Sequence, residues 1–182
     1  MDRLVAGRLT ALRGQRGWTL EELAGRSGMS RATLSRIERC ELSPTAAMLG
    51  KLCSAYGWTL SRLFADAETG SPSLVRASGQ VVWTDPESGY QRKAISPPGS
   101  GFRGEMVEVK IPPGATVTFE ASPLPRLEHH LWMISGALDL ELDGIRHSLQ
   151  AGDCLRYLLN GPSIFEATGK RAAHYVVVIV HP

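Results

Sequence analysis

The sequence predicts two domains of different class, a small all-α bundle followed by an all-β barrel of the jelly-roll kind. Apolar residues recur at helical spacing as far as Phe64, and beyond about residue 76 they alternate as in half-buried strands. Between these parts, residues 67–73 read AETGSPS, a small, polar, proline-containing run typical of a linker. We therefore expect a helical domain at 1–66, a linker at 67–75 and an all-β domain at 76–182.

Charge is divided unevenly between the two parts. Residues 1–66 contain 10 Lys and Arg against 6 Asp and Glu, and residues 67–182 contain 10 against 12. The first part is therefore basic and the second mildly acidic. This division favours contact with nucleic acid by the first part alone.

The sequence also indicates a compartment. The opening residues MDRLVAGRL carry charges where a secretory signal has its apolar region, and the longest wholly apolar run, 175–180, is too short to span a membrane. The three cysteines show no CxxC spacing. We expect a reduced, cytoplasmic protein without a membrane partner, whose cysteines are more readily explained as inert than as thiol sensors.

Thr19 to Glu41 is predicted to form two short helices joined by a tight turn. Gly28 supplies the turn, because glycine adopts positive φ at little cost, and Ser30 is placed to cap the second helix. A helix–turn–helix of this kind enters a DNA major groove, whereas an ordinary helical hairpin would have only a solvated basic face. The exposed face of the second helix carries small and basic residues: Arg31, Ala32, Ser35 and Arg36.

Three more helices are predicted around this pair, giving a five-helix bundle. They run from Leu4 to about Arg16, from about Pro44 to Gly57, and from Thr59 to Phe64. The segment LRGQRGWTLEELAGRSGMSRATLSRIERCELSP, with its flanking helices, resembles the XRE-type domain of phage-repressor-like regulators over Leu4 to Phe64.

This resemblance implies double-stranded operator DNA as a partner and assigns roles to individual residues. Base edges would be read by Arg31, Ala32 and Arg36, since arginine suits bidentate contact with guanine. Ser30, Ser35 and the amides that follow Thr19 would position phosphates. The resemblance also implies a structural pair between Arg13 and Glu38. The chain departs from the family at Leu20, where many members carry a glutamine.

The second domain is predicted as a series of short strands. Its clearest signal is LDLELDGIRHSL, in which Asp143-Gly144 makes a two-residue turn between alternating runs. The stretch 83–101, which contains Tyr90, Arg92 and Lys93, is expected to be a long turn-rich segment covering either the barrel mouth or the domain junction. Expected strands lie near 74–75, 80–83, 106–111, 117–119, 131–134, 138–142, 145–149, 154–159 and 175–180.

The order of PPG, ISGALDLELDG and AGDCLRY is similar to that of a cupin, over roughly Val81 to His181. An XRE-type domain followed by a cupin is a bacterial regulator arrangement. The resemblance implies a DNA-binding homodimer whose cupin barrel receives a small-molecule effector.

Enzymatic cupins usually hold a metal with three histidines and a glutamate, and this chain departs from that set. Ala121 to Pro125 stand where the first two ligands are expected, His129 stands at the usual glutamate, and Ser163 stands at the usual last histidine. We therefore expect no bound metal and no cofactor.

A metal-free barrel still suits one small ligand. Only one of His129 and His130 can face its interior, because neighbours on a strand point to opposite faces. Arg156 would favour an anionic effector, although an internal ion pair with Asp153 or Glu128 is an equal alternative. The side chains expected in the effector site are Glu128, His129, His130, Trp132, Arg156 and His174, with Met133 and Tyr157 also in the lining.

These features predict a non-enzymatic, one-component transcriptional regulator whose barrel tunes operator binding. Two alternatives stay open: a cupin metalloenzyme with an accessory DNA-binding domain, and a regulator whose cupin only dimerises.

Overall fold

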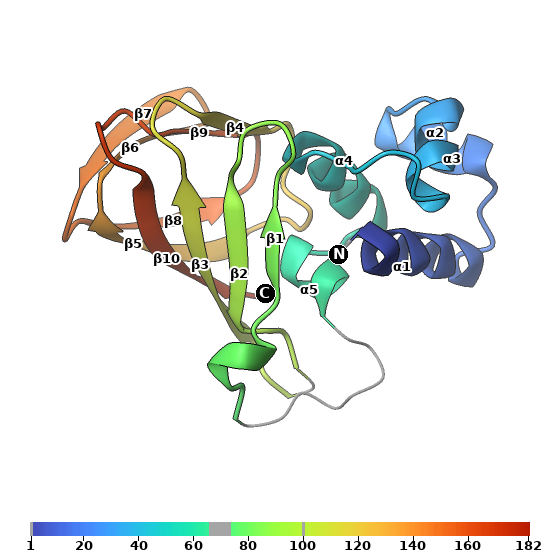
Figure 1. Ribbon diagram of the computed structural model, residues 1–182, viewed down its shortest axis with the longest axis horizontal. Coiled ribbons are helices and arrows are strands. Elements are labelled where there is room, and N and C mark those ends of the chain that lie inside the picture. The colour runs from blue at the N-terminus through green and yellow to red at the C-terminus, as the bar shows by residue number, and fades with distance from the viewer. Residues whose placement is uncertain (1, 66–73, 100) are drawn as a thin grey trace.

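The computed structural model describes residues 2–65, 74–99 and 101–182 (Figure 1). Most of the predicted linker, 67–75, therefore lies outside the described residues. The described chain begins with helices and continues with strands, as expected. The helices are α1 (Asp2–Gln15), α2 (Leu20–Ser27), α3 (Arg31–Glu38), α4 (Ala46–Tyr56) and α5 (Leu60–Phe64), followed by a short 3-10 turn, Ala77–Gly79.

Side-chain caps fix where the helices begin. Thr19, Ser30, Thr45 and Thr59 each accept a hydrogen bond from the backbone amide three residues later, at the starts of α2 to α5. Gly28 ends α2 with φ 67°, the left-handed conformation that glycine adopts without strain. The predicted turn and cap of the helix–turn–helix are thus confirmed.

Two antiparallel sheets follow. Six strands pair in the order β1-β2-β3-β10-β5-β8, and four pair in the order β4-β9-β6-β7. Their bounds are β1 (Val82–Thr84), β2 (Gln91–Ser96), β3 (Gly104–Ile111), β4 (Thr116–Phe119), β5 (Leu127–Ser135), β6 (Ala137–Leu142), β7 (Ile145–Gln150), β8 (Cys154–Leu159), β9 (Ser163–Glu166) and β10 (Ala173–Val180).

The strand predictions hold for most of this domain, with two corrections. Asp143 and Gly144 both have positive φ, 49° and 79°, as the predicted tight hairpin between β6 and β7 requires. Leu74-Val75, in contrast, is not a strand. Residues 91–96, expected within a turn-rich segment, form β2, which pairs with β1 and β3. Backbone pairing on both sides makes β2 an inner strand despite its polar sequence, QRKAIS.

Helices α4 and α5 pack directly against the sheets (Figure 1). Gly50 of α4 lies against the Phe119 ring of β4 so closely that a Cβ at this position would meet a ring carbon at 2.9 Å. Lys51 of α4 pairs with Glu120 at 2.9 Å. Phe64 of α5 stacks on Trp83 of β1, with ring centroids 5.7 Å apart. The helical part therefore rests on the sheet domain through α4 and α5, leaving α2 and α3 at the far end.

The Asp85 carboxylate, from the sheet domain, reinforces the start of α4. Its Oδ1 accepts a hydrogen bond from the Ala46 amide at 2.8 Å, and its Oδ2 accepts one from the Ser88 amide at 2.9 Å. A buried carboxylate at a helix N-terminus is favoured by the helix dipole. Helix α4 is thus capped by its own Thr45 and by the other domain.

None of the helices in the described ranges combines the length and the apolar character that crossing a membrane requires.

Candidate nucleic-acid interface and ligand cavity

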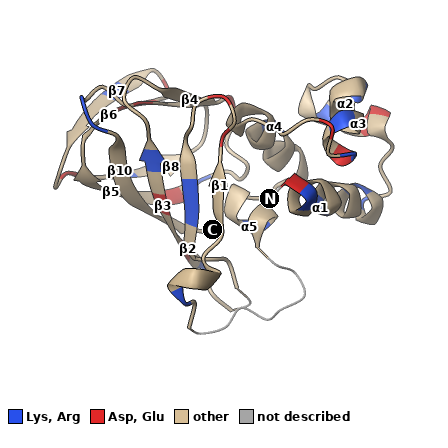
Figure 2. Cartoon of the chain, in the orientation of Figure 1, with Lys and Arg blue, Asp and Glu red and all other residues tan. Residues whose placement is uncertain are grey.

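The outer face of α3 carries free guanidinium groups. Arg31, Ala32 and Arg36 are exposed and Ser35 is half-buried, while Leu34 and Ile37 on the opposite side are buried in the core. Among the described residues, the ion pairs do not include Arg36. The four predicted residues therefore lie on one accessible face of α3, and Figure 2 shows this helix at the end of the molecule away from the sheets.

Arg31 has only a weak intramolecular partner. Its Nε lies 3.9 Å from the Glu21 carboxylate, and both side chains are largely exposed, at 69% and 80%. An exposed pair at this distance contributes little free energy, since water screens it. Arg31 is therefore free to exchange Glu21 for another anion.

A half-buried ion pair holds α3 in place. Arg13 of α1 donates to both oxygens of Glu38, from Nε at 2.8 Å and from Nη2 at 2.7 Å, and its Nη1 donates to the Trp18 carbonyl at 3.0 Å. A bidentate fork fixes direction as well as distance. The predicted pairing of Arg13 with Glu38 is confirmed, and it orients the helix that carries Arg31 and Arg36.

Helix caps occupy two of the places predicted to face phosphates, the Ser30 hydroxyl and the start of α2. Thr19 and Glu22 form a reciprocal capping box, in which Glu22 Oε2 accepts from the Thr19 amide at 2.7 Å and from its hydroxyl at 3.0 Å. Ser30 Oγ accepts from the Thr33 amide at 3.1 Å. The Glu22 carboxylate thus stands at the start of α2, where the resemblance implied a phosphate, so an approaching phosphate must displace it.

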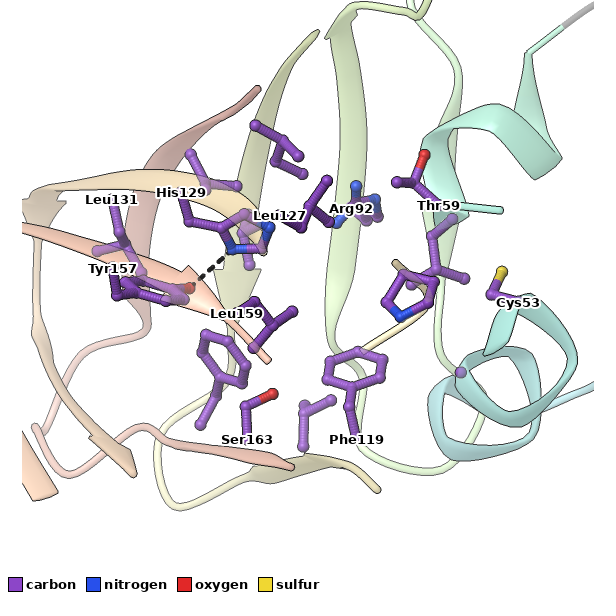
Figure 3. A pocket seen from close by; sticks show the side chains of 18 of the residues that line it. Cys53, Thr59, Arg92, Phe119, Leu127, His129, Leu131, Tyr157, Leu159 and Ser163 are labelled. Atoms are coloured by element: carbon purple, nitrogen blue, oxygen red, sulfur yellow. Dashed lines mark hydrogen bonds between the residues drawn. The ribbon is translucent and has the colours of Figure 1, made fainter. Parts of the chain in front are cut away.

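A cavity lies between the two sheets and is closed on one side by the helical domain. It encloses about 750 Å³ of empty space, including its opening to solvent. Its walls are mostly apolar, with Leu127, Leu131 and Leu159 from the six-stranded sheet and Phe119 and Phe165 from the four-stranded sheet. Figure 3 shows Cys53 and Thr59, two residues of the helical domain, at the same cavity. A mostly apolar lining with a few polar groups is typical of sites for small molecules.

One polar group in this cavity is a neutral histidine. His129 Nδ1 hydrogen-bonds the Tyr157 hydroxyl at 3.0 Å, and its Nε2 is buried with no partner in the described structure (Figure 3). Burial, with a smaller effect from the Arg92 charge, lowers the pKa of His129 to about 3. Burial also raises the pKa of the Tyr157 hydroxyl. At neutral pH the cavity therefore presents an uncharged imidazole with one free hydrogen-bonding position.

The cavity also holds a charged group, Arg92, which the sequence prediction did not place in the site. It lies on β2, and its Nη2 donates to Ser61 Oγ of α5 at 2.6 Å. Desolvation acts to lower its pKa, but nearby Tyr90 and Glu105 outweigh this, so the pKa is raised and the guanidinium stays charged. Arg92 is the one Lys, Arg, Asp or Glu side chain in the described lining of the cavity. The alternation of Tyr90 and Arg92 was the available signal, and it was hidden in a stretch expected to be a loop.

Of the six residues predicted for the effector site, the structure places His129 alone in the cavity lining. Glu128, His130 and Trp132 alternate with His129 along β5 and point to the outer face, where Glu128 and His130 pair at 2.7 Å. Arg156 lies opposite His130 on β8 and is exposed. His174 bonds Glu108 at 2.8 Å, also away from the cavity. The placement of these five residues is corrected, because adjacent residues of a strand face opposite sides.

The cavity's donor atoms do not fit the metal that many cupins hold. His129 and Ser163 line it, but the remaining wall near them is leucine and aromatic, and His129 Nδ1 is already bonded to Tyr157. Among the described residues, no three His, Cys, Asp or Glu side chains converge on one point. Met133, expected in the lining, is instead fully buried.

Comparison with known proteins identifies the helical part. A family described as a helix-turn-helix domain matches residues 4–65. The HTH-type transcriptional regulator SutR of Escherichia coli K12 is 28% identical over 100% of this chain and 97% of its own length. The uncharacterized HTH-type transcriptional regulator y4dJ of Sinorhizobium fredii is 40% identical over 57 residues, 31% of this chain and 74% of that protein. The chain belongs to the XRE-type helix-turn-helix transcriptional regulators.

Solved structures resemble the fold of this regulator as a whole and of its sheet domain. A crystal structure of an HTH_3 family transcriptional regulator from Vibrio cholerae has a TM-score of 0.82 at 24% identity, covering 100% of this chain and 97% of that chain. A cupin-2 domain protein from Rhodospirillum rubrum, Rru_A2000, has a TM-score of 0.50 at 16% identity over 64% of this chain and 80% of that chain. The regulator thus has a helix–turn–helix domain followed by a domain with a cupin-like fold.

Proposed function

We propose that this regulator reads a specific operator through α3 and that a small molecule in the sheet domain changes the affinity of that contact. Arg31 and Arg36 are proposed to bind guanine edges, with Ala32 against a neighbouring base. Ser30, Ser35 and the backbone after Thr19 are proposed to contact phosphates. The observation that carries the proposal is Arg36, which is exposed on a face held rigidly by Arg13 and Glu38 and has no ion-pair partner among the described residues.

Operator binding by Arg36→Ala tests this function. An operator is first selected from a random DNA pool with the wild-type protein. A bidentate arginine–guanine contact supplies about 1–3 kcal/mol of discrimination, so the variant should lose roughly 5- to 150-fold on the operator and much less on random DNA. Arg171→Ala, an exposed arginine of the sheet domain, is the matched control. Equal losses on operator and random DNA would exclude base reading by Arg36.

We propose that the regulator acts in the cytoplasm as a homodimer joined through the outer face of the six-stranded sheet. This face exposes large apolar side chains, with Trp132 53%, Leu158 44% and Met106 37% accessible. Charges of both signs, Arg156 and Glu128, lie beside them, which suits a two-fold interface between identical surfaces. Sedimentation should give a dimer for wild type and a monomer for Trp132→Glu. A dimer holds its two α3 helices about one DNA turn apart, which separate monomers do not.

The cavity supports a sensing cupin over the alternatives. Its mostly apolar wall and its polar side chains, among them Arg92 and His129, are suited to one small effector, and the positive charge favours an anion. A cupin that only dimerises would not need a charged side chain in the lining of this cavity. The metalloenzyme alternative makes a different prediction, because purified protein would then contain stoichiometric iron, nickel, manganese or zinc.

A further inference from the structure

Resting on this proposed function, we propose that the effector is a small carboxylic acid bound by Arg92, and that the bond from Arg92 to Ser61 transmits its arrival to the helical domain. Nothing in the relatives' names specifies such a ligand. The inference rests on where Arg92 lies, on what it already bonds and on what surrounds it.

The first step concerns charge. Arg92 carries a permanent positive charge into an otherwise apolar or neutral lining. Among the described residues, no carboxylate lies within ion-pair distance of its guanidinium. Glu105 is close enough to influence it, but the basic side chain within ion-pair distance of Glu105 is His181, at 3.8 Å. Arg92 therefore lacks the direct anionic partner that a buried guanidinium requires.

The second step concerns the number of donors. A guanidinium has five N–H donors in a planar fork that matches a carboxylate. Ser61 Oγ accepts from one nitrogen of Arg92 and the Tyr90 side chain is a second partner, which still leaves donors for a ligand. The free Nε2 of His129 offers a second hydrogen-bonding position in the same cavity. A small acid with an apolar body, especially one bearing a hydroxyl or carbonyl group, would satisfy both.

The third step concerns transmission. Ser61 is 2% exposed and belongs to α5, while Thr59 and Leu60, which precede it, form part of the cavity wall. A second path leads the same way, since Tyr90 of the wall contacts Trp83 edge-on and Trp83 stacks on Phe64 of α5. Helix α5 in turn contacts α1 and α4 of the bundle. An acid that draws Arg92 toward itself therefore acts directly on the helical domain.

Thermal stability and operator affinity are measured with isovalerate, benzoate and salicylate, each paired with its neutral amide. On wild type, at least one acid should raise the melting temperature and change operator affinity by about fivefold or more, whereas its amide should do neither. Arg92→Gln should weaken acid binding at least about tenfold. Arg171→Gln, at an exposed arginine of the sheet domain outside the cavity lining, should bind acid as wild type does.

Ser61→Ala separates binding from transmission. It should keep acid affinity within about threefold of wild type, while the acid-dependent change in operator affinity falls below about twofold. Ser54→Ala, which removes a long contact from α4 to the Ala121 carbonyl, is the matched control and should keep the full response.

The outcomes distinguish the inference from the proposed function. If amides act as well as acids, or if Arg92→Gln responds normally, the acid-binding assignment is overturned while effector sensing stands. A full response in Ser61→Ala overturns the transmission step alone. If no compound stabilises wild type or changes its operator affinity, sensing in the cavity and the inference both fail. Should Arg92→Gln not fold, the comparison of acids with amides on wild type still decides.

Discussion

Helix α3 and the cavity both carry arginine, in opposite surroundings. Arg31 and Arg36 extend into water from a helix held by a bidentate ion pair. Arg92 lies among apolar walls and is bonded to a neighbouring helix. An exposed charge attracts DNA from a distance and is screened by salt, whereas an enclosed charge acts at contact and discriminates by shape. Arginine thus suits DNA recognition on the exposed helix and small-molecule recognition in the cavity.

The two cysteines nearest these regions should differ most in reactivity. Cys40, directly after α3, is exposed, while Cys53 lies in the cavity wall, where burial raises the pKa of its thiol from 9.0 to about 12. The thiolate fraction of Cys53 at neutral pH is then about a thousandfold below that of an ordinary thiol. Iodoacetamide and mass spectrometry should find Cys40 alkylated in the native protein and Cys53 protected. Comparable rates would mean that the cavity wall opens readily.

Salt should weaken DNA binding by α3 much more than acid binding at Arg92. Raising salt from about 50 to about 200 mM should lower operator affinity by roughly a hundredfold or more, because several phosphate contacts release counterions. Binding of an acid in the cavity should change less than about threefold, since an enclosed pair is screened weakly. Filter binding for DNA and calorimetry for the acid measure both. Equal salt dependence would show that the cavity site is as open as α3.

His129 should make the stability of the sheet domain fall in mild acid. Its folded-state pKa of about 3 lies below the ordinary 6.5, so the unfolded chain binds the proton first. Stability is complete above pH 6.5 and declines as pH falls toward 3, with about 2 kcal/mol lost between pH 7 and 5. Urea unfolding should show this slope in wild type and in His147→Gln. His129→Leu should lack it.

Of these changes, loss of the Asp85 carboxylate at the domain junction should have the smallest effect, a small fall in the free energy of unfolding. In Asp85→Asn, one oxygen still accepts from Ala46, but the amide nitrogen cannot accept from Ser88, and the charge at the α4 start is lost. We expect about 1 kcal/mol lower free energy of unfolding. Glu87→Gln, an exposed neighbour, should change it by less than about 0.5 kcal/mol. If the two variants behave alike, the junction does not depend on this cap.

The helix–turn–helix was predictable because its signals are local. Gly28, Ser30 and the Arg13–Glu38 pair act over short stretches or within a recognisable pattern, and all lie where expected. The cavity depends on which face of each strand turns inward. His129 and His130 differ by one residue, and only strand pairing decides between them. Arg92 was overlooked because QRKAIS has the composition of a loop, and only its pairing with β1 and β3 makes it a strand.

The contact of Gly50 with Phe119 limits how this regulator can be recombined. Even a methyl group at position 50 would collide with the ring at 2.9 Å, and the start of α4 draws a cap from the sheet domain. A helical domain grafted from another regulator must therefore bring a compatible α4 surface, or Phe119 must be replaced by a smaller side chain at the same time. The DNA specificity of this protein is thus more readily exchanged by rewriting the face of α3 than by replacing the domain.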